Sequence, residues 1–399
     1  MRRCKFVCWG SDRLLVNGLR AIRAHTILFV AVKMRTIRSA CCFGAFFGSL
    51  FKDVREGKTM NMRTGYLSEV GKVEVKGFEV PEFDDNSVLM KVKAAGICGS
   101  DLHAFHGSHP FRKPPMILGH EATGDVVKLG ANVKGLRVGE RITVEPIKAC
   151  GKCEYCLGGA YNLCPQRVGA GVSGWLGAFA EYFVVPEQRV HKLPPELDYE
   201  LGVLVEPLAV GTHAVRLSEM RPGSTCVVLG TGTVGMLAGV AAQAAGAARV
   251  YCTDLNRFRL RTAEALGLYP IKADEVSAEE TVKSFAPYGA DVVLVAFTSP
   301  HVVDQALKIV KRGGKVIIIA LFTDPVAFDI NTLQGSEVGL KGSHIYTKED
   351  FQSAIRILVE RKEDLRKAIT HHVGLDGIGG ALEMLTDPNS PAIKIIVQP

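Results

Sequence analysis

Short runs of Val, Ile and Leu, each bounded by Gly, Pro, Asn or Asp, follow one another from Met62 to about residue 206. Apolar runs of this length between turn residues are typical of β-strands. We therefore predict a β-rich domain in this part of the chain. Its clearest predicted strands are Lys72–Val75, Ser87–Ala95, Ala122–Leu129 and Arg141–Val144.

After Glu206-Pro207 the pattern changes to apolar strands that alternate with helical segments. Runs such as Val-Val-Leu-Val and Val-Ile-Ile-Ile suit strands that are covered on both faces, as strands of parallel sheets are. We predict a doubly wound α/β domain here. The predicted strands are Thr225–Leu229, Arg249–Thr253, Asp291–Phe297 and Lys315–Ala320, and the predicted helices are Val234–Ala245, Arg257–Leu266 and His301–Lys311.

The end of the chain predicts a helix, Lys348–Glu360, and a final strand, Ala392–Val397, which we expect to return to the first domain. A length of 399 residues with 47% hydrophobic content supports two cores, since domains usually hold about 100–200 residues. We predict one domain from residues 60–206 and 344–399, and a second from residues 207–343. The sequence shows no internal repeat.

The formal charge of +7 is concentrated in the first 59 residues, which hold twelve Lys or Arg and three acidic residues. This surplus of nine (12 − 3) leaves the rest of the chain at −2 (7 − 9), so no basic groove for nucleic acid is expected. The apolar runs Thr26–Val32 and Ala40–Phe51 are shorter than the roughly 20 residues of a membrane span. We therefore expect neither a nucleic-acid nor a membrane partner.

Three interpretations of residues 1–59 stay open. The Arg-rich, acid-poor composition resembles an organelle transit peptide, and a secretory signal peptide fits less well because no clean cleavage site follows. We favour a translation start at Met60 or Met62. Purine-rich codons can encode Arg55-Glu56-Gly57-Lys58, and a bacterial ribosome-binding site just before Met60 would be a purine-rich sequence of this kind. The expected location is the cytoplasm.

Four of the eleven cysteines lie within fifteen residues, as Cys150-x2-Cys153-x2-Cys156-x7-Cys164. Four thiolates at this spacing can close a tetrahedron around one Zn²⁺ and leave no vacant position, so the predicted zinc site is structural. Two disulfides, four unrelated thiols or an iron–sulfur cluster are the alternatives. Crowding of this kind favours a metal in a reducing compartment.

A glycine-rich turn, Gly230-Thr-Gly232-Thr-Val-Gly235, follows a predicted strand and opens a predicted helix. In that context Gly230 permits a tight turn, Gly232 lets the backbone approach a pyrophosphate, and Gly235 allows close packing. Asp254 ends the next strand, where a carboxylate accepts from ribose hydroxyls and repels a 2′-phosphate, so NAD is favoured over NADP. The predicted cofactor contacts are Gly230, Gly232, Thr233, Val234, Gly235, Asp254 and Arg259.

Further metal ligands are dispersed along the chain: Cys98, His120, Glu121 and Glu206. Each alone is better explained by a packed thiol, a core histidine or a solvated acid. Together they offer the soft, borderline and hard ligands that a catalytic Zn²⁺ accepts while one position stays open.

These motifs, in this order, resemble the zinc-dependent medium-chain dehydrogenase/reductase family. The match runs from about residue 62 to the end and is carried by Gly-Ile-Cys-Gly-Ser-Asp, Gly-His-Glu, the four-cysteine segment and Glu-Pro-Leu-Ala-Val-Gly. The resemblance implies a GroES-like catalytic domain, a Rossmann domain, NAD and two zinc ions per chain. It implies that Cys98, His120 and Glu121 hold the catalytic zinc, with Glu206 as a ligand or as the partner of its water.

Glu206 stands where the alcohol dehydrogenases proper carry a cysteine, which resembles the polyol branch with its sorbitol, threonine and butanediol dehydrogenases. The resemblance implies oxidation of a secondary alcohol, in a homotetramer or dimer. It assigns the alcohol proton to a relay through Ser100 and His103, and a histidine titrates near the working pH. His106 and His109 are expected at the surface.

The substrate wall departs from the sorbitol dehydrogenase pattern. Ala104 replaces an aromatic residue, and Ile345-Tyr346 replaces an Arg-Tyr pair, so a long free polyol is in doubt. His344 and Tyr346 are candidate substrate contacts, with plain packing as the alternative for Tyr346. A zinc-free, NADPH-dependent reductase of activated alkenes and a nucleotide-binding relative without turnover are rival functions, and both predict a missing or broken ligand set.

Overall fold

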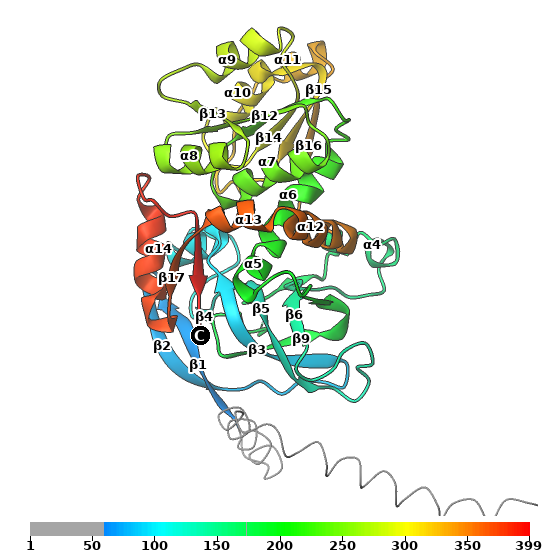
Figure 1. Cartoon of the computed structure of the whole chain (residues 1–399), viewed down its shortest axis with the longest axis vertical. Coiled ribbons are helices and arrows are strands. Elements are labelled where there is room, and N and C mark those ends of the chain that lie inside the picture. Colours follow the sequence, from blue (N-terminus) through cyan, green and yellow to red (C-terminus); the bar gives the residue numbers. More distant parts are fainter. Residues whose placement is uncertain (1–59, 173) are drawn as a thin grey trace, which may run out of the picture. The chain divides into compact units, whose positions relative to one another are not determined.

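The computed structural model describes residues 60–172 and 174–399. The interpretations of residues 1–59 fall outside this range. Residues Asn61–Pro399 form one unit, in which a β-rich part and a parallel sheet with helices can be followed in Figure 1. Within the described residues, no helix is both long and apolar enough to cross a bilayer.

The β-rich part is built on a seven-stranded sheet that contains three of the four predicted strands. The fourth, which begins at Lys72, lies in a separate three-stranded sheet. The larger sheet has the order β10 (Val190–Lys192), β6 (Arg141–Val144), β5 (Glu121–Leu129), β3 (Ser87–Gly96), β18 (Lys394–Val397) and β17 (Ile369–Val373), with β9 (Tyr182–Pro186) also on β3. The smaller sheet consists of β2 (Lys72–Glu79), β1 (Asn61–Glu69) and β4 (Met116–Ile117).

The end of the chain returns to this β-rich part, as predicted. Strand β18 runs antiparallel to β3, with Ile396 opposite Gly96, and parallel to β17. On its other side, β3 places Gly96 opposite Glu121, the first residue of β5. The sheet therefore brings together the end of β3, the start of β5 and the final strand, which are separated by up to about 300 residues of chain.

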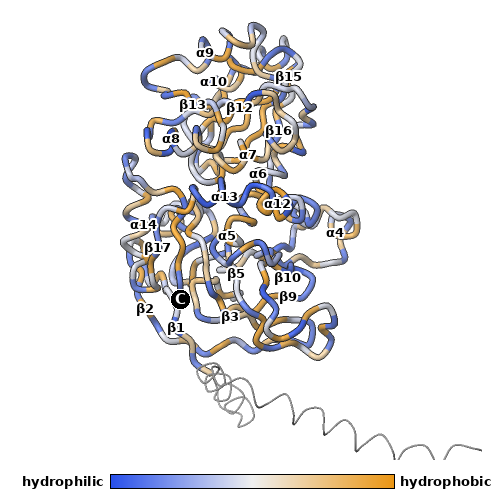
Figure 2. Tube along the Cα trace, in the orientation of Figure 1, coloured by the Kyte–Doolittle hydropathy of each residue, from blue (hydrophilic) through white to orange (hydrophobic). Residues whose placement is uncertain are grey.

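The second part is a six-stranded parallel sheet, which confirms the predicted α/β fold. Its order is β13 (Tyr269–Lys272), β12 (Arg249–Asp254), β11 (Thr225–Leu229), β14 (Ala290–Val295), β15 (Val310–Ile318) and β16 (Gly339–Gly342). The helices that connect these strands are α7 (Thr233–Ala244), α8 (Arg257–Ala265), α9 (Ala278–Phe285), α10 (Val302–Ile309) and α11 (Ile330–Gly335). Figure 2 shows the hydrophobic colour gathered on the inner strands.

Several elements differ from the prediction in their bounds, and some elements were not predicted. The helix expected up to Lys311 ends at Ile309, because β15 begins at Val310 and continues through Gly313-Gly314. The final strand starts at Lys394, two residues later than expected. A helix in the β-rich part, α3 (Gly99–Phe105), was not predicted, although it carries two of the candidate site residues.

The glycine-rich turn has the backbone shape that its sequence suggested. Gly230 has a φ of +90°, a left-handed conformation that favours glycine. A Cβ at Gly235 would lie 1.9 Å from the carbonyl oxygen of Gly230, so any side chain there would push the helix off the strand. A Cβ at Gly232 would meet no atom within 4 Å, so this position is open.

Two longer helices pack against α7 and against each other. Helix α6 (Val205–Leu217) contacts α7 closely, since a Cβ at Gly211 would lie 2.6 Å from the Cα of Ala238. Helix α12 (Lys348–Glu360), found with the predicted bounds, packs on α6. The remaining helical elements are α4 (Glu154–Leu157), α5 (Tyr199–Val203), α13 (Lys362–Leu365), α14 (Ile378–Thr386), and the 3-10 turns η1 (Tyr161–Leu163), η2 (Glu187–Arg189), η3 (Arg366–Ala368) and η4 (Leu375–Gly377). A two-stranded ribbon joins β7 (Ile147–Lys148) to β8 (Val168–Gly169).

The contact between α6 and α12 is held by the buried carboxylate of Asp350. His213 Nδ1 and Arg216 Nε each lie 2.7 Å from its oxygens, and the backbone N–H of Thr347 donates at 2.8 Å. Burial raises the pKa of Asp350, but these hydrogen bonds outweigh burial and hold the pKa below its ordinary value. The carboxylate is therefore charged at neutral pH.

Replacing Asp350 by asparagine is expected to lower the free energy of unfolding by about 2 to 3 kcal/mol at pH 7, since hydrogen bonds to charged groups are lost. A carboxyl whose pKa is lowered by folding stabilises the protein above its unfolded pKa of about 3.9 and loses this effect as the pH falls through the folded value. The difference between the two proteins should therefore shrink below about pH 4. Urea unfolding at pH 7 and pH 3 measures it, with Asp85→Asn at an exposed site as control. An equal difference at both pH values would contradict the assignment.

Candidate active site and metal centres

The structure gathers three of the four dispersed candidate ligands. One ligand atom each from Cys98, His120 and Glu121 lies within 4.8 Å of the others. Cys98 follows the end of β3 and caps α3, whereas His120 and Glu121 stand at the start of β5, which is paired with β3. The local β-pairing therefore positions residues that are about twenty positions apart in the sequence.

The charges at this group fit a cation. Both oxygens of Glu121 are buried: Oε2 accepts a hydrogen bond of 2.6 Å from Lys394, while Oε1 has no partner among the described residues. A buried carboxylate oxygen without a partner is costly, and a metal held with the thiolate of Cys98 and the imidazole of His120 would satisfy it. The donor set therefore fits a zinc ion with an open position.

Asp101 and Arg112 orient the ring of His120 from the side of its Nδ1 atom. Its Nδ1 lies 3.4 Å from Asp101 and 3.1 Å from the guanidinium of Arg112, which leaves Nε2 on the side of Ser100, 3.5 Å away. Burial lowers the pKa of His120, but the carboxylate of Asp101 outweighs burial and raises it. Despite burial, the charges and hydrogen bonds of His120, Arg112 and Cys98 lower the pKa of Asp101 to about 2. A carboxylate behind a histidine is the usual support of a metal-binding imidazole.

Glu206 lies outside the three-residue group. It stands in the first turn of α6, is buried, and accepts a hydrogen bond of 3.0 Å from the hydroxyl of Tyr346. Burial raises the pKa of Glu206 to about 7, and the neighbouring charge of Glu121 contributes. Tyr346 is 0% exposed, which supports the packing interpretation and gives its hydroxyl a protein partner.

The two predicted relay residues lie on one helix, α3, three positions apart. Ser100 faces His120, whereas Nδ1 of His103 lies 3.1 Å from Ser108. Burial lowers the pKa of His103, and the charge of His106 adds to this effect. No hydrogen bond within residues 60–172 and 174–399 joins Ser100 to His103 directly.

Helix α3 and the residues after it include three residues discussed in the sequence analysis: Ala104, His106 and His109. His106 is exposed as expected, but His109 is only 3% exposed, because its Nδ1 accepts from the backbone N–H of Arg112 inside the fold. Ala104 is fully buried in the core of the β-rich part. The expected surface position of His109 was therefore wrong.

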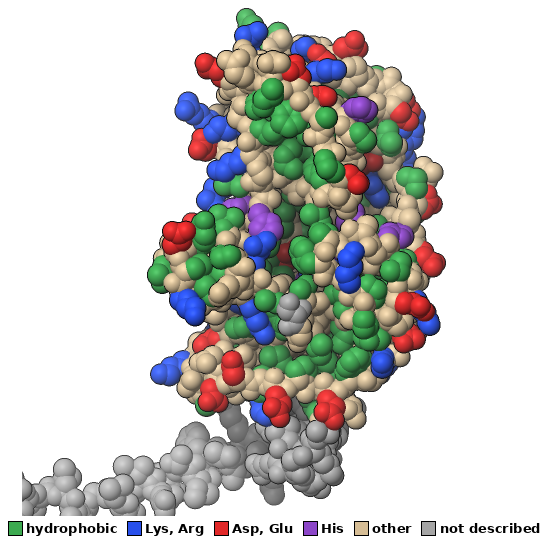
Figure 3. Space-filling model, turned by 180° about the vertical axis from the view of Figure 1, so that it is seen from behind, with side chains coloured by type: hydrophobic (Ala, Val, Ile, Leu, Met, Phe, Trp, Pro, Cys, Tyr) green, Lys and Arg blue, Asp and Glu red, His purple; other side chains and the backbone are tan. Residues whose placement is uncertain are grey.

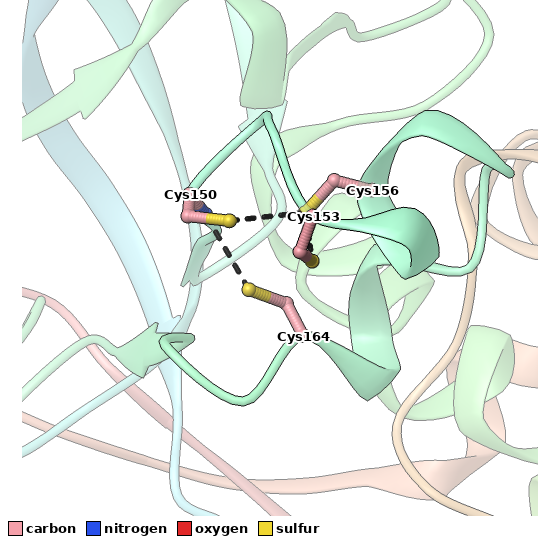
Figure 4. A group of neighbouring side chains, drawn as sticks. All are labelled: Cys150, Cys153, Cys156 and Cys164. Atoms are coloured by element: carbon pink, nitrogen blue, oxygen red, sulfur yellow. Dashed lines mark hydrogen bonds between the residues drawn. The ribbon is translucent and has the colours of Figure 1, made fainter.

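The four cysteines of the segment 150–164 form a second group. Figure 4 shows their side chains turned toward one another, and their sulfur atoms lie within 4.8 Å of each other. The cysteines described by the structure are free, and the Sγ atoms of Cys153 and Cys156 are 3.5 Å apart, much farther than the roughly 2.05 Å of a disulfide. This spacing contradicts the disulfide alternative and suits four thiolates around one zinc ion.

The candidate cofactor site lies at the carboxyl ends of the parallel strands. Asp254 ends β12 and accepts hydrogen bonds from the backbone N–H groups of Thr231, at 3.0 Å, and Asn256, at 2.9 Å. Arg259 has Nη1 3.9 Å from Asp254, and its Nε is buried without a partner among the described residues. The hydroxyl of Thr233 donates to the carbonyl of Ile393, which links α7 to the segment before β18.

Sequence reasoning missed three supporting residues, namely Asp101, Arg112 and Lys394. Lys394 is 1% exposed, and a signal for it existed: it is the one charged residue in the otherwise apolar run Ala392–Val397. Asp101 stood in a quoted motif without a role, and Arg112 had no local signal.

On the face seen in Figure 3, histidine side chains lie at the rim of a hollow midway along the described part.

The chain matches two protein families. Residues 84–195 match the alcohol dehydrogenase GroES-like domain, and residues 233–360 match the zinc-binding dehydrogenase family. The first range contains Cys98, His120, Glu121 and the four-cysteine segment. The second contains most of the parallel sheet.

Individual relatives cover most of the chain. The chain is 33% identical to the sorbitol dehydrogenase of Bacillus subtilis (strain 168), over 85% of this chain and 98% of the relative. The crystal structure of 2R,3R-butanediol dehydrogenase from Bacillus subtilis is 31% identical, with a TM-score of 0.78 and coverage of 85% and 99%. A zinc-binding dehydrogenase structure from Sinorhizobium meliloti 1021, bound to NADP, is also 31% identical, with a TM-score of 0.78 and coverage of 85% and 100%.

Proposed function

The chain belongs to the zinc-dependent alcohol dehydrogenases with a GroES-like domain, and we propose that it oxidises a secondary alcohol to a ketone with NAD. Relatives named sorbitol dehydrogenase, D-xylulose reductase and butanediol dehydrogenase support a polyol, diol or amino alcohol as substrate. The observation that carries this proposal is the convergence of Cys98, His120 and Glu121, with one buried carboxylate oxygen free for a metal.

In the proposed reaction, the residues of the site have separate roles. When bound, zinc lowers the pKa of a hydroxyl in its coordination sphere from about 16 to about 7, and NAD accepts the hydride. Ser100 and His103 receive the alcohol proton and pass it toward the surface. Asp101 keeps the imidazole of His120 in place. The turn at Gly230 offers backbone N–H groups to the dinucleotide phosphates.

The substrate range follows from residue 345. Ile345 cannot orient several hydroxyls as an arginine would, so we propose a small diol, an amino alcohol or a cyclic polyol in preference to a long free polyol. Formation of NADH by the zinc-loaded protein should be screened with sorbitol, xylitol, inositols, butane-2,3-diol and threonine. Turnover of none of these alcohols, in a protein that holds both metals, would contradict the proposal.

A nucleotide-binding relative without turnover is the alternative from another class, and threonine or butanediol dehydrogenation is the alternative within the enzyme class. The group of Cys98, His120 and Glu121 disfavours the first, as it disfavours a zinc-free reductase. Metal analysis distinguishes them, because about two zinc ions per chain support the enzyme and about one supports the four-cysteine segment alone.

Replacing Asp254 by asparagine is expected to lower the preference for NAD over NADP by at least about tenfold. A 2′-phosphate beside the carboxylate is repelled by a like charge, and one charge pair at about 4 Å is worth about 1 to 4 kcal/mol near a protein surface. The ratio of kcat/KM for the two cofactors measures this effect, with Asp274→Asn at an exposed site as control. An unchanged ratio would show that Asp254 does not determine the preference between NAD and NADP.

We keep three further statements as proposals. The division into residues 60–206 with 344–399 and residues 207–343 is supported by the two separate sheets. A reducing, cytoplasmic location is supported by the free thiols of the four-cysteine segment. We also propose a homotetramer or dimer, with a small-molecule alcohol as partner and neither nucleic acid nor membrane.

A further inference from the structure

Residues 344–346 join two parts of the site that the sequence separates widely. On one side, the amide of Asn162 donates a hydrogen bond of 2.9 Å to the carbonyl oxygen of His344. On the other side, the hydroxyl of Tyr346 donates to Glu206 at 3.0 Å. Asn162 lies between the last two cysteines of the four-cysteine segment, so this short loop connects that segment to the carboxylate beside the candidate catalytic metal site.

The loop has a strained residue between its two attachments. Ile345 has a φ of +55°, a left-handed conformation that is a genuine outlier for a β-branched side chain. Such a conformation costs about 1 to 3 kcal/mol and persists only where the surroundings determine it. The bonds at His344 and Tyr346 therefore act on a segment that would relax if either were removed.

The buried side chain of Asn162 lacks one of its possible hydrogen bonds. It is 2% exposed, and its Oδ1 is buried without a partner among the described residues. An unsatisfied buried polar atom costs about 1 to 3 kcal/mol, which an apolar side chain would avoid. The amide of Asn162 therefore contributes only through its N–H donor, which binds the carbonyl oxygen of His344.

The turn that carries Asn162 is itself anchored. The hydroxyl of Tyr161 donates to the buried carboxylate of Glu145, which also has His191 Nε2 at 2.7 Å and Arg189 at 3.3 Å. The guanidinium of Arg189 lies over the ring of Tyr161 at 3.7 Å. Asn162 is thus presented from a rigid base, and its position depends on the segment that the four cysteines close.

At the other end, Tyr346 is held by packing. Its ring is fully buried and lies 5.5 Å from the ring of Phe351, which in turn lies 4.6 Å from His191. Within the described residues, the hydrogen bond from Tyr346 is the one that the side chain of Glu206 accepts. A displacement of the loop would therefore release Glu206.

We propose that Asn162 and Tyr346 are positioning residues that act as one unit, so that the four-cysteine segment sets the place of Glu206 at the catalytic metal site through residues 344–346. This inference rests on the proposed function, because it assumes a metal at Cys98, His120 and Glu121. It adds to that function a role of the four-cysteine segment in positioning Glu206 at the catalytic metal site.

A double-mutant cycle tests the unit. Cobalt is placed at the catalytic site and zinc in the four-cysteine segment, and the loss of cobalt to a chelator is followed by its absorption spectrum. Tyr346→Phe and Asn162→Ala should each speed the loss of cobalt by about 10-fold or more, as expected for residues that support metal ligands. The double variant should be no faster than the faster single variant, because both remove the same restraint. Tyr155→Phe and Asn389→Ala, at exposed positions, serve as matched controls and should change nothing.

The outcomes separate this inference from the function beneath it. If the unaltered chain takes up no cobalt at the catalytic site, the proposed function fails. If it does, but Asn162→Ala has no effect, or the two effects multiply in the double variant, the inference is overturned. Should Asn162→Ala lose the segment's zinc, Asn162→Asp takes its place in the cycle, since it keeps the shape and replaces the donor by an acceptor.

Discussion

Replacing Cys98 by serine is expected to slow alcohol oxidation by at least about 1,000-fold while NAD binding is unchanged. A hydroxyl is a much weaker zinc ligand than a thiolate, so the lowered pKa of a bound alcohol is lost. A 1,000-fold loss corresponds to about 4 kcal/mol of the activation barrier, which is within what a metal supplies as a Lewis acid. Steady-state rates of NADH formation and NAD binding by calorimetry measure the two quantities.

The metal count distinguishes this result from general damage. Zinc should fall from about two ions per chain to about one, because the four-cysteine segment is untouched. Cys226→Ala is the matched control, since Cys226 is a fully buried thiol in β11, away from both metal groups. It should keep both metals and most of the activity. Undiminished turnover in Cys98→Ser would remove the basis of the proposed mechanism.

The parts of the fold that the sequence predicted best are those with a local cause. Strand β11 and helix α12 have the predicted bounds, because continuous apolar runs and helical periodicity need no distant partner. Gly230 and Gly235 were interpretable for the same reason, since a strand, a turn and a helix follow each other directly. Short strands such as β16 were missed, because they are defined by pairing with a neighbour.

The site was predictable only as far as its residue types were unusual. Cys98, His120 and Glu121 could be grouped because their side chains are suited to one metal. Tyr346 and Glu206 are 140 positions apart, and nothing local pairs them. Tertiary packing decides such contacts, so the sequence left Tyr346 between a substrate contact and a packed ring.

Lys394 offers the sharpest test of the electrostatics at the candidate metal site. Its ammonium is 1% exposed and donates to Glu121 at 2.6 Å and to the carbonyl of Ile97 at 2.9 Å. Burial lowers the pKa of Lys394, but the charges of Glu121 and Cys98 outweigh burial and raise it. The lysine is therefore charged inside the fold and compensates one of the two anionic groups.

Replacing Lys394 by methionine is expected to lower the free energy of unfolding of the metal-free protein by about 3 to 5 kcal/mol. Removing one partner of a buried ion pair leaves the other charge uncompensated, and that charge belongs to Glu121. Unfolding in urea, with and without zinc, measures the effect. Lys192→Met, which removes an exposed partner of Glu140, is the matched control and should cost less than about 1 kcal/mol.

Zinc should restore more stability to the Lys394→Met variant than to the unaltered protein. A cation at the site would become the main partner of Glu121, so the gain in stability on adding zinc should grow when the lysine is absent. Retention of full stability by the metal-free variant would mean that Glu121 is protonated or solvated there, and that the carboxylate is not a preformed ligand. An equal gain from zinc in both proteins would mean that the metal and Lys394 do not share this carboxylate, and the assignment of Glu121 as a ligand would then be lost.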